Sequence, residues 1–227
     1  MSVFTGINAI LTDIEGTTTD IDFVHKTLFP YARERMVDFV HHHPNEPAVA
    51  EAAQALGVAA DDLDAIANGL IGWIDQDKKE TSLKALQGLI WVQGYTQGDF
   101  TGHLYPDAHA GLQRWHAAGK QLHIFSSGSV KAQKLLYGYS DFGDLNPLFS
   151  GYFDTTTGAK REPVAYTRIT AAIGLPAAEI LFLSDVVEEL DAAAEAGMQT
   201  CLLVRGERPA GAERHTAVDN FDLIELD

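Results

Sequence analysis

The chain has 227 residues, 46% of them hydrophobic and 21% charged, which is typical of one large folded domain or of a domain that carries an insertion. Its formal net charge of −16 argues against nucleic acid and anionic membranes as partners. Cys201 is the only cysteine, no apolar run reaches the ~18 residues of a membrane span, and no signal peptide is expected, so we expect a cytoplasmic protein without intrachain disulfides.

The first predicted strand is the apolar run INAILT at residues 7–12. Residues 20–100 then change character, because four successive stretches follow helical periodicity and none reads as a strand. Pro30 is expected to split or kink the first of these helices. The pattern therefore predicts an all-helical insert directly after the first strand.

Further apolar runs at residues 121–126, 179–184 and 199–204 predict three more buried strands. Helical patterns lie between them: VKAQKLLYGY, PVAYTRITAAIG and VEELDAAAEAG. Strands that alternate with helices in this way indicate βαβ units and a parallel sheet. The predicted fold class is therefore α/β, with a Rossmann-like core interrupted by a helical insert.

Polar side chains follow three of these strands. They are Asp13 and Glu15 after the first, Ser126 and Ser127 after the second, and Asp185, Glu188 and Glu189 after the third. Ligands of open parallel sheets bind beyond the carboxyl ends of the strands, so neighbouring strands would bring these groups to one site. Lys160, in a loop ahead of a predicted helix, could join them.

Together these residue types suit phosphoryl transfer. A carboxylate can attack phosphorus, carboxylate and carbonyl oxygens can hold Mg²⁺, and the hydroxyl and N–H groups of SSGS can bind phosphate oxygens at a helix start. A lysine can neutralise the remaining charge. Each piece taken alone is more often a turn, a helix cap or a solvated side chain, so the prediction depends on the combination.

The segment DIEGT at residues 13–17 is similar to the D-x-D-x-T signature of the haloacid dehalogenase-like superfamily, with Glu15 in place of the second Asp. D-x-E-G-T-T, together with IFSSGSVKAQKLL, GYFDTTTGAKRE and ILFLSDVVEELDAA, resembles the enolase-phosphatase family of methionine salvage. The segment WIDQDKKETSLKALQGLIW extends the resemblance into the insert, so it covers nearly the whole chain.

The resemblance implies a role for each of these positions. Asp13 would be the nucleophile and a ligand of one Mg²⁺ ion, and Glu15 would be an acid/base with a contact to the metal. Asp185 would be the remaining protein ligand of Mg²⁺. Ser126, Ser127 and Lys160 would bind the phosphate of a small phosphorylated substrate. Whether Glu188 or Glu189, if either, reaches the metal through water is left open.

The resemblance also implies a catalytic core at residues 1–19 and 101–227 and a cap at 20–100. The expected reaction enolises 2,3-diketo-5-methylthiopentyl 1-phosphate and then hydrolyses the enol phosphate to an acireductone and phosphate. The alternatives are a capped phosphatase for another small ester and a non-catalytic binding protein on the same fold. A monomer is expected, because the chain has no heptad seam.

Overall fold

The computed structural model describes residues 1–227, and the chain divides into two compact units. The first unit joins Met1–Ile21 to Gly102–Asp227, and the second is Asp22–Thr101. The boundaries predicted from the sequence, 1–19 and 101–227 against 20–100, fall near these divisions. None of the helices combines the length and the apolar composition that a membrane span requires.

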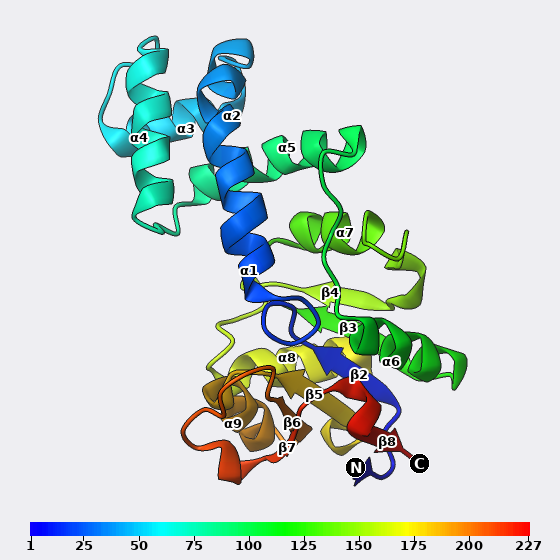
Figure 1. Ribbon diagram of the computed structural model, residues 1–227. Helices are drawn as coiled ribbons and strands as arrows, with labels where there is room; N and C mark the ends of the chain where they lie inside the picture. Colours follow the sequence, from blue (N-terminus) through cyan, green and yellow to red (C-terminus); the bar gives the residue numbers. More distant parts are fainter. The chain divides into compact units, whose positions relative to one another are not determined.

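The first unit is built on a parallel six-stranded sheet with strand order β4-β3-β2-β5-β6-β7 (Figure 1). Its strands are β2 (Ala9–Thr12), β3 (Gln121–Phe125), β4 (Gly151–Phe153), β5 (Ile180–Ser184), β6 (Gln199–Leu203) and β7 (Thr216–Val218). A separate parallel pair joins β1 (Ser2–Phe4) to β8 (Ile224–Leu226). The predicted α/β class and parallel sheet are confirmed. The sequence did not predict the two edge strands, β4 and β7, which have only three residues each.

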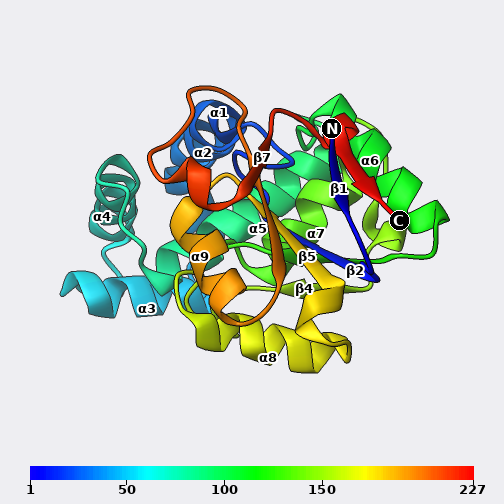
Figure 2. The same cartoon turned by 90° about the horizontal axis from the view of Figure 1, so that it is seen from below.

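Helices cover both faces of this sheet, as Figure 1 and Figure 2 show. On one side lie α6 (Pro106–Ala117) and α7 (Val130–Gly138), and on the other lie α8 (Pro163–Ile173) and α9 (Val187–Glu195). Leu11 and Phe182 from the sheet, Tyr166 from α8 and Leu190 from α9 share one buried core. Because both faces are covered, the central strands β2 and β5 are buried along their whole length, which explains their mainly hydrophobic sequences. Short 3₁₀ turns span Asn146–Leu148, Ala177–Glu179, Ala212–Arg214 and Phe221–Leu223.

The second unit contains helices and no strand. The chain enters it through α1 (Ile21–Phe23) and a π-helical turn at Val24–Leu28. The remaining helices are α2 (Phe29–His42), α3 (Pro47–Leu56), α4 (Leu63–Asp75) and α5 (Thr81–Gln97). Pro30 is the second residue of α2, which continues directly from the π-helical turn. Leu28 and Phe29 keep right-handed helical backbone angles, so the predicted split is wrong and only the helical hydrogen-bond pattern changes just before the proline. Met36, Leu70 and Leu86 belong to a separate buried core of this unit.

Candidate active site

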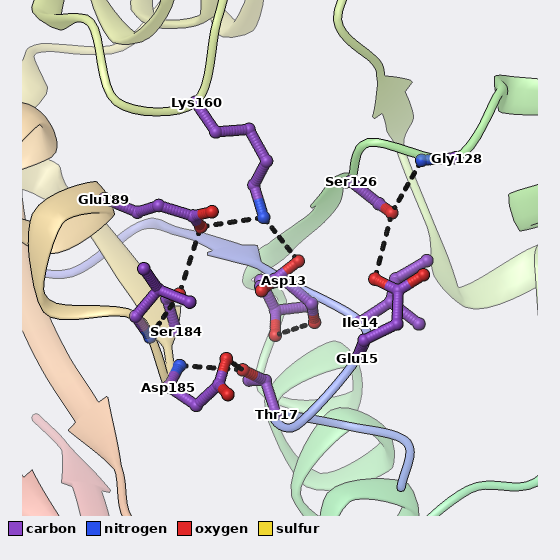
Figure 3. A network of polar contacts seen from close by, with 12 residues as sticks. Asp13, Ile14, Glu15, Thr17, Ser126, Gly128, Lys160, Ser184, Asp185 and Glu189 are labelled. Atoms are coloured by element: carbon purple, nitrogen blue, oxygen red, sulfur yellow. Dashed lines mark hydrogen bonds and ion pairs between the residues drawn. The ribbon is translucent and has the colours of Figure 1, made fainter. Parts of the chain in front are cut away.

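The candidate site lies at the carboxyl ends of three neighbouring strands. β2 pairs in parallel with β3 on one side and with β5 on the other, so all three end at the same edge of the sheet. Asp13, Ser126 and Asp185 each directly follow one of these strands. Figure 3 shows their side chains gathered around one space, together with Lys160. The chain order also changes direction at β2, as it does where ligands bind in other open α/β sheets.

A tight turn after β2 holds the first signature segment against Asp185. The carbonyl oxygen of Ile14 accepts the N–H groups of residues 17, 18 and 19 at 3.1, 2.9 and 2.9 Å. Gly16 has a φ of +75°, a conformation that L side chains rarely adopt. A Cβ atom at this position would lie 2.1 Å from Asp185 Oδ2. Only glycine therefore allows the turn to lie this close to the carboxylate.

Asp13 and Lys160 form a buried ion pair at the centre of the site. Lys160 Nζ lies 2.6 Å from Asp13 Oδ1 and 2.7 Å from Glu189 Oε2, and Asp13 and Lys160 are only 3% and 8% exposed. The Tyr166 hydroxyl donates to the Lys160 carbonyl oxygen at 2.7 Å, which fixes the loop that carries the lysine. Burial works against the charged ammonium, but the two carboxylates outweigh it and raise the pKa of Lys160. Lys160 is thus a fixed positive charge beside Asp13.

Glu188 and Glu189, which the sequence left undistinguished, lie in different surroundings. Glu189 is buried and accepts hydrogen bonds from Lys160 and, at 3.1 Å, from the Ser184 hydroxyl, whereas Glu188 is exposed. Burial, reinforced by the charge of Asp13, raises the pKa of Glu189. The acid that faces the site is therefore Glu189, and its direct partner is the lysine.

Asp185 is oriented by Thr17 from the turn after β2. The Asp185 backbone N–H donates to Thr17 Oγ1 at 3.0 Å, and the same hydroxyl lies 3.4 Å from Asp185 Oδ1 (Figure 3). Burial, with a further contribution from the charge of Asp13, raises the pKa of Asp185 to about 6. The Asp185 carboxylate therefore lies in a position where a nearby cation would stabilise its ionised form.

Glu15 lies on the opposite side of Asp13 from Glu189, as Figure 3 shows. The Ser126 hydroxyl donates to Glu15 Oε2 at 3.3 Å and accepts the Gly128 N–H at 3.1 Å. Burial, and then the charge of Asp13, raises the pKa of Glu15. Ser127, the other serine predicted to bind phosphate, is exposed on the loop after β3.

A model of the haloacid dehalogenase-like hydrolase family matches residues 7–197. The chain belongs to the haloacid dehalogenase-like hydrolase family. It is 57% identical over 223 residues to Enolase-phosphatase E1 of Pseudomonas aeruginosa, covering 96% of this chain and 98% of the relative. Enolase-phosphatase E1 of Pectobacterium carotovorum is 54% identical over 224 residues, 97% of each chain. The solved structure of the UTR4 protein from Saccharomyces cerevisiae is 35% identical, with a TM-score of 0.81 over 96% of this chain and 99% of that one. The predicted resemblance is confirmed.

In this haloacid dehalogenase-like chain, the charges of the site suit a divalent cation. Four carboxylates, those of Asp13, Glu15, Asp185 and Glu189, face one ammonium, and burial raises the pKa of three of them. No group of three or more His, Cys, Asp or Glu side chains is arranged as a ready metal cage. Mg²⁺ commonly binds through one or two carboxylates together with water and substrate phosphate, so Asp13 and Asp185 fit such a site. The Glu15 carboxylate faces Ser126, and its predicted contact with the metal stays a prediction.

Two residues that support the site were not predicted from the sequence. Thr17 orients Asp185, and the only indication of its importance in the sequence was its position in the DIEGT segment at residues 13–17. Gln133 is buried on α7, and its side-chain amide donates to the carbonyl oxygens of Gly128 and Phe153, both at 2.8 Å. These bonds tie the Ser126–Gly128 loop to β4. No sequence signal marked Gln133, because its role depends on how α7 packs beside that edge strand.

Proposed function

We propose that this protein is a Mg²⁺-dependent enolase-phosphatase of methionine salvage. It converts 2,3-diketo-5-methylthiopentyl 1-phosphate, through its enol phosphate, to 1,2-dihydroxy-3-keto-5-methylthiopentene and phosphate. The observation that carries the proposal is the Asp13–Lys160 pair, 2.6 Å apart at the end of the central strand, in a chain that matches relatives named Enolase-phosphatase E1 over nearly its full length.

In the phosphatase step, an Asp13 oxygen attacks phosphorus and the bond between phosphorus and the enol oxygen breaks. Water then cleaves the aspartyl-phosphate, which regenerates the carboxylate and releases phosphate. Lys160 neutralises charge that develops on the phosphoryl oxygens, and Ser126 and Ser127 bind the same group. The Lys160 ammonium lies 2.6 Å from Asp13 Oδ1, so its positive charge lies directly beside the carboxylate that attacks.

In the enolisation step, a base removes a proton from C1 and a carbonyl oxygen gains one. We assign the base to Glu15, whose raised pKa suits a group that accepts and returns protons. Asp13 and Asp185 would hold Mg²⁺, which when bound would polarise the ketone oxygens and neutralise phosphate charge. An enol is a better leaving group than an alcohol, so the phosphatase step needs less acid assistance and Glu15 is available for the proton at C1.

The experiment supplies the diketo phosphate and follows the enol absorbance, C1 hydrogen exchange in D₂O and phosphate release together. Asp13→Asn should abolish phosphate release while exchange continues above the rate of Mg²⁺ without protein. Glu15→Gln should slow exchange sharply. Exchange at only the control rate in a substrate-binding Asp13→Asn variant would place Asp13 in the proton transfer, and normal exchange in Glu15→Gln would place the base elsewhere. Wild-type protein that releases no phosphate would contradict the proposed function.

Three finer assignments also stay predictions. Residues 20–100 are expected to act as a cap that excludes water from the reaction and selects the substrate. A monomer is expected, and light scattering coupled to size-exclusion chromatography would measure the oligomeric state. A cytoplasmic location is consistent with a single, buried cysteine at residue 201.

A further inference from the structure

Arg205 lies just beyond β6, at the same carboxyl edge of the sheet as the site, and has no role in the proposed reaction. Its side chain is only 14% exposed. Nε and Nη2 of its guanidinium both donate to the carbonyl oxygen of Thr17, at 3.2 and 2.9 Å. The side chain must reach past β5 to do so, because β5 lies between β6 and β2 in the sheet. The guanidinium of Arg205 therefore binds the Thr17 carbonyl group in the turn after β2.

The guanidinium is held on its other sides as well. Nη1 lies 2.9 Å from Asp107 Oδ1 and 2.8 Å from Oδ2, and Asp107 Oδ2 accepts the backbone N–H of Phe221 at 2.8 Å. The guanidinium carbon lies 4.2 Å from the centre of the Tyr105 ring, a cation–π contact. Three segments distant in sequence, at residues 17, 105–107 and 221, thus surround this group, and the planar guanidinium offers the several fixed donors that such an arrangement requires.

Thr17 transmits this constraint to the site. Its carbonyl oxygen is bound by Arg205, and its hydroxyl accepts the Asp185 N–H at 3.0 Å and lies 3.4 Å from the Asp185 carboxylate. Thr17 is fully buried, so water cannot replace either contact without a rearrangement. We infer that Arg205 is a positioning residue, which fixes Thr17 so that Asp185 is presented in the orientation that Mg²⁺ binding requires. The inference rests on the proposed function, because it takes Asp185 to be a magnesium ligand.

If the role of Arg205 were only structural, its contacts would stabilise the fold but would not affect Mg²⁺ binding at Asp185. Arg214 offers a matched control, because it also pairs with an aspartate, Asp191 at 2.9 Å, and also donates to a backbone carbonyl, that of Gly211 at 3.3 Å. Arg214 is half-exposed and contacts no residue of the site. Arg205→Met and Arg214→Met therefore remove the same charge and similar contacts, but only the first releases Thr17.

The test measures Mg²⁺ binding to the free protein by calorimetry, with thermal stability, kcat and KM measured in parallel. Outer partners of metal ligands typically change affinity or activity by about 10- to 100-fold, so Arg205→Met should weaken Mg²⁺ binding about tenfold. We expect kcat to fall by a similar factor with KM nearly unchanged, Arg205→Lys to recover part of the loss, and Arg214→Met to bind Mg²⁺ like wild type. Arg205→Met with wild-type Mg²⁺ affinity would overturn the inference.

A double-variant cycle tests the route through Thr17. Thr17→Val removes the hydroxyl that contacts Asp185 but leaves the carbonyl that contacts Arg205. Because both changes break one chain of contacts, Arg205→Met should weaken Mg²⁺ binding little further in the Thr17→Val background. Full additivity of the two losses would overturn the route.

If Arg205→Met does not fold, Asp107→Asn provides the same test, because it removes the charge that holds the guanidinium in place. A folded Asp107→Asn protein with wild-type Mg²⁺ affinity would overturn the inference. The calorimetry uses Mg²⁺ without substrate. Wild-type protein that binds Mg²⁺ but does not convert the diketo phosphate would therefore contradict the proposed reaction, while the comparison of Arg205 variants would still stand.

Discussion

Replacing Gly16 with alanine should leave the protein folded but greatly lower its activity. Gly16 has a φ of +75°, so any L side chain there adopts a left-handed backbone conformation. In addition, the new Cβ would lie 2.1 Å from Asp185 Oδ2 and 2.6 Å from Asp185 Cγ. These are the closest atoms, and they belong to the end of a side chain rather than to the backbone. The carboxylate can therefore rotate away, which relieves the overlap at little cost in stability but removes Asp185 from its position.

The loss of activity can be estimated from these distances, and the loss of stability from the backbone conformation. Relieving the overlap means moving the carboxylate oxygen from 2.1 Å to beyond 3.0 Å, the least separation that Cβ atoms show. A displacement of about 1 Å at a reacting group can lower the rate about 100-fold. The left-handed conformation costs about 1 kcal/mol of stability in an L residue. Gly16→Ala should thus remain folded but lose about two orders of magnitude in kcat.

Gly174 provides the matched control, because its φ is +79° and no atom lies within 4 Å of the Cβ that alanine would add. Gly174→Ala incurs the same backbone cost without touching the site. Urea denaturation would measure the free energy of unfolding of both variants, and phosphate release from the diketo phosphate would measure kcat. We expect similar losses of stability and a large difference in kcat. If Gly16→Ala keeps a kcat within about threefold of Gly174→Ala, the close approach of residue 16 to Asp185 has no bearing on catalysis.

The remaining predictions concern a carboxylate, the metal and pH. Glu189→Gln removes one of the two carboxylate charges that hold Lys160, so kcat should fall about tenfold. Glu188 is exposed, so the kcat of Glu188→Gln should stay near that of wild type, and equal kcat values for the two variants would contradict the role of Glu189 in holding Lys160. Excess EDTA should abolish phosphate release and Mg²⁺ should restore it, with Ca²⁺ a poor substitute because it prefers more ligands at longer distances; turnover in excess chelator would contradict the mechanism. Burial lowers the pKa of His123 to about 4 from its ordinary 6.5, so on acidification the unfolded chain binds a proton at this residue before the folded protein does. The contribution of neutral His123 to stability is therefore fully present above pH 6.5 and is lost as the pH falls toward 4. Between pH 7 and 5 this group should remove about 2 kcal/mol from the free energy of unfolding, and denaturation of His123→Leu should lack that part of the slope while exposed His116→Leu keeps it.

The sequence predicted the central strands and the residues at their ends. β2, β3, β5 and β6 are mostly apolar because both faces of the sheet are covered, and such runs are visible without a structure. Asp13, Ser126 and Asp185 directly follow three of these strands, so parallel pairing brings them together. The edge strands were missed because GYF and TAV are too short to form a pattern.

What the sequence could not predict is how side chains contact one another across the site. Glu188 and Glu189 are the same residue type, and only the direction of α9 places Glu189 beside Lys160 and leaves Glu188 exposed. Arg205 and Thr17 are 188 positions apart, and their contact depends on β6 lying two strands from β2. Spacing along the chain carries no information on such contacts, because strand order is set by crossovers whose lengths vary.

The position of Glu15 explains how one site can keep two carboxylates chemically distinct. Asp13 and Glu15 are two residues apart, yet Asp13 contacts the ammonium of Lys160 at 2.6 Å while Glu15 contacts the hydroxyl of Ser126 at 3.3 Å. The ammonium of Lys160 places a positive charge beside Asp13, whereas burial raises the pKa of Glu15 and leaves its carboxylate able to exchange a proton. The additional methylene of glutamate gives the reach to Ser126, and an aspartate at residue 15 would hold its carboxylate back from that hydroxyl. A glutamate in the signature therefore suits the proposed division of roles, in which the second carboxylate moves a proton while the first attacks phosphorus.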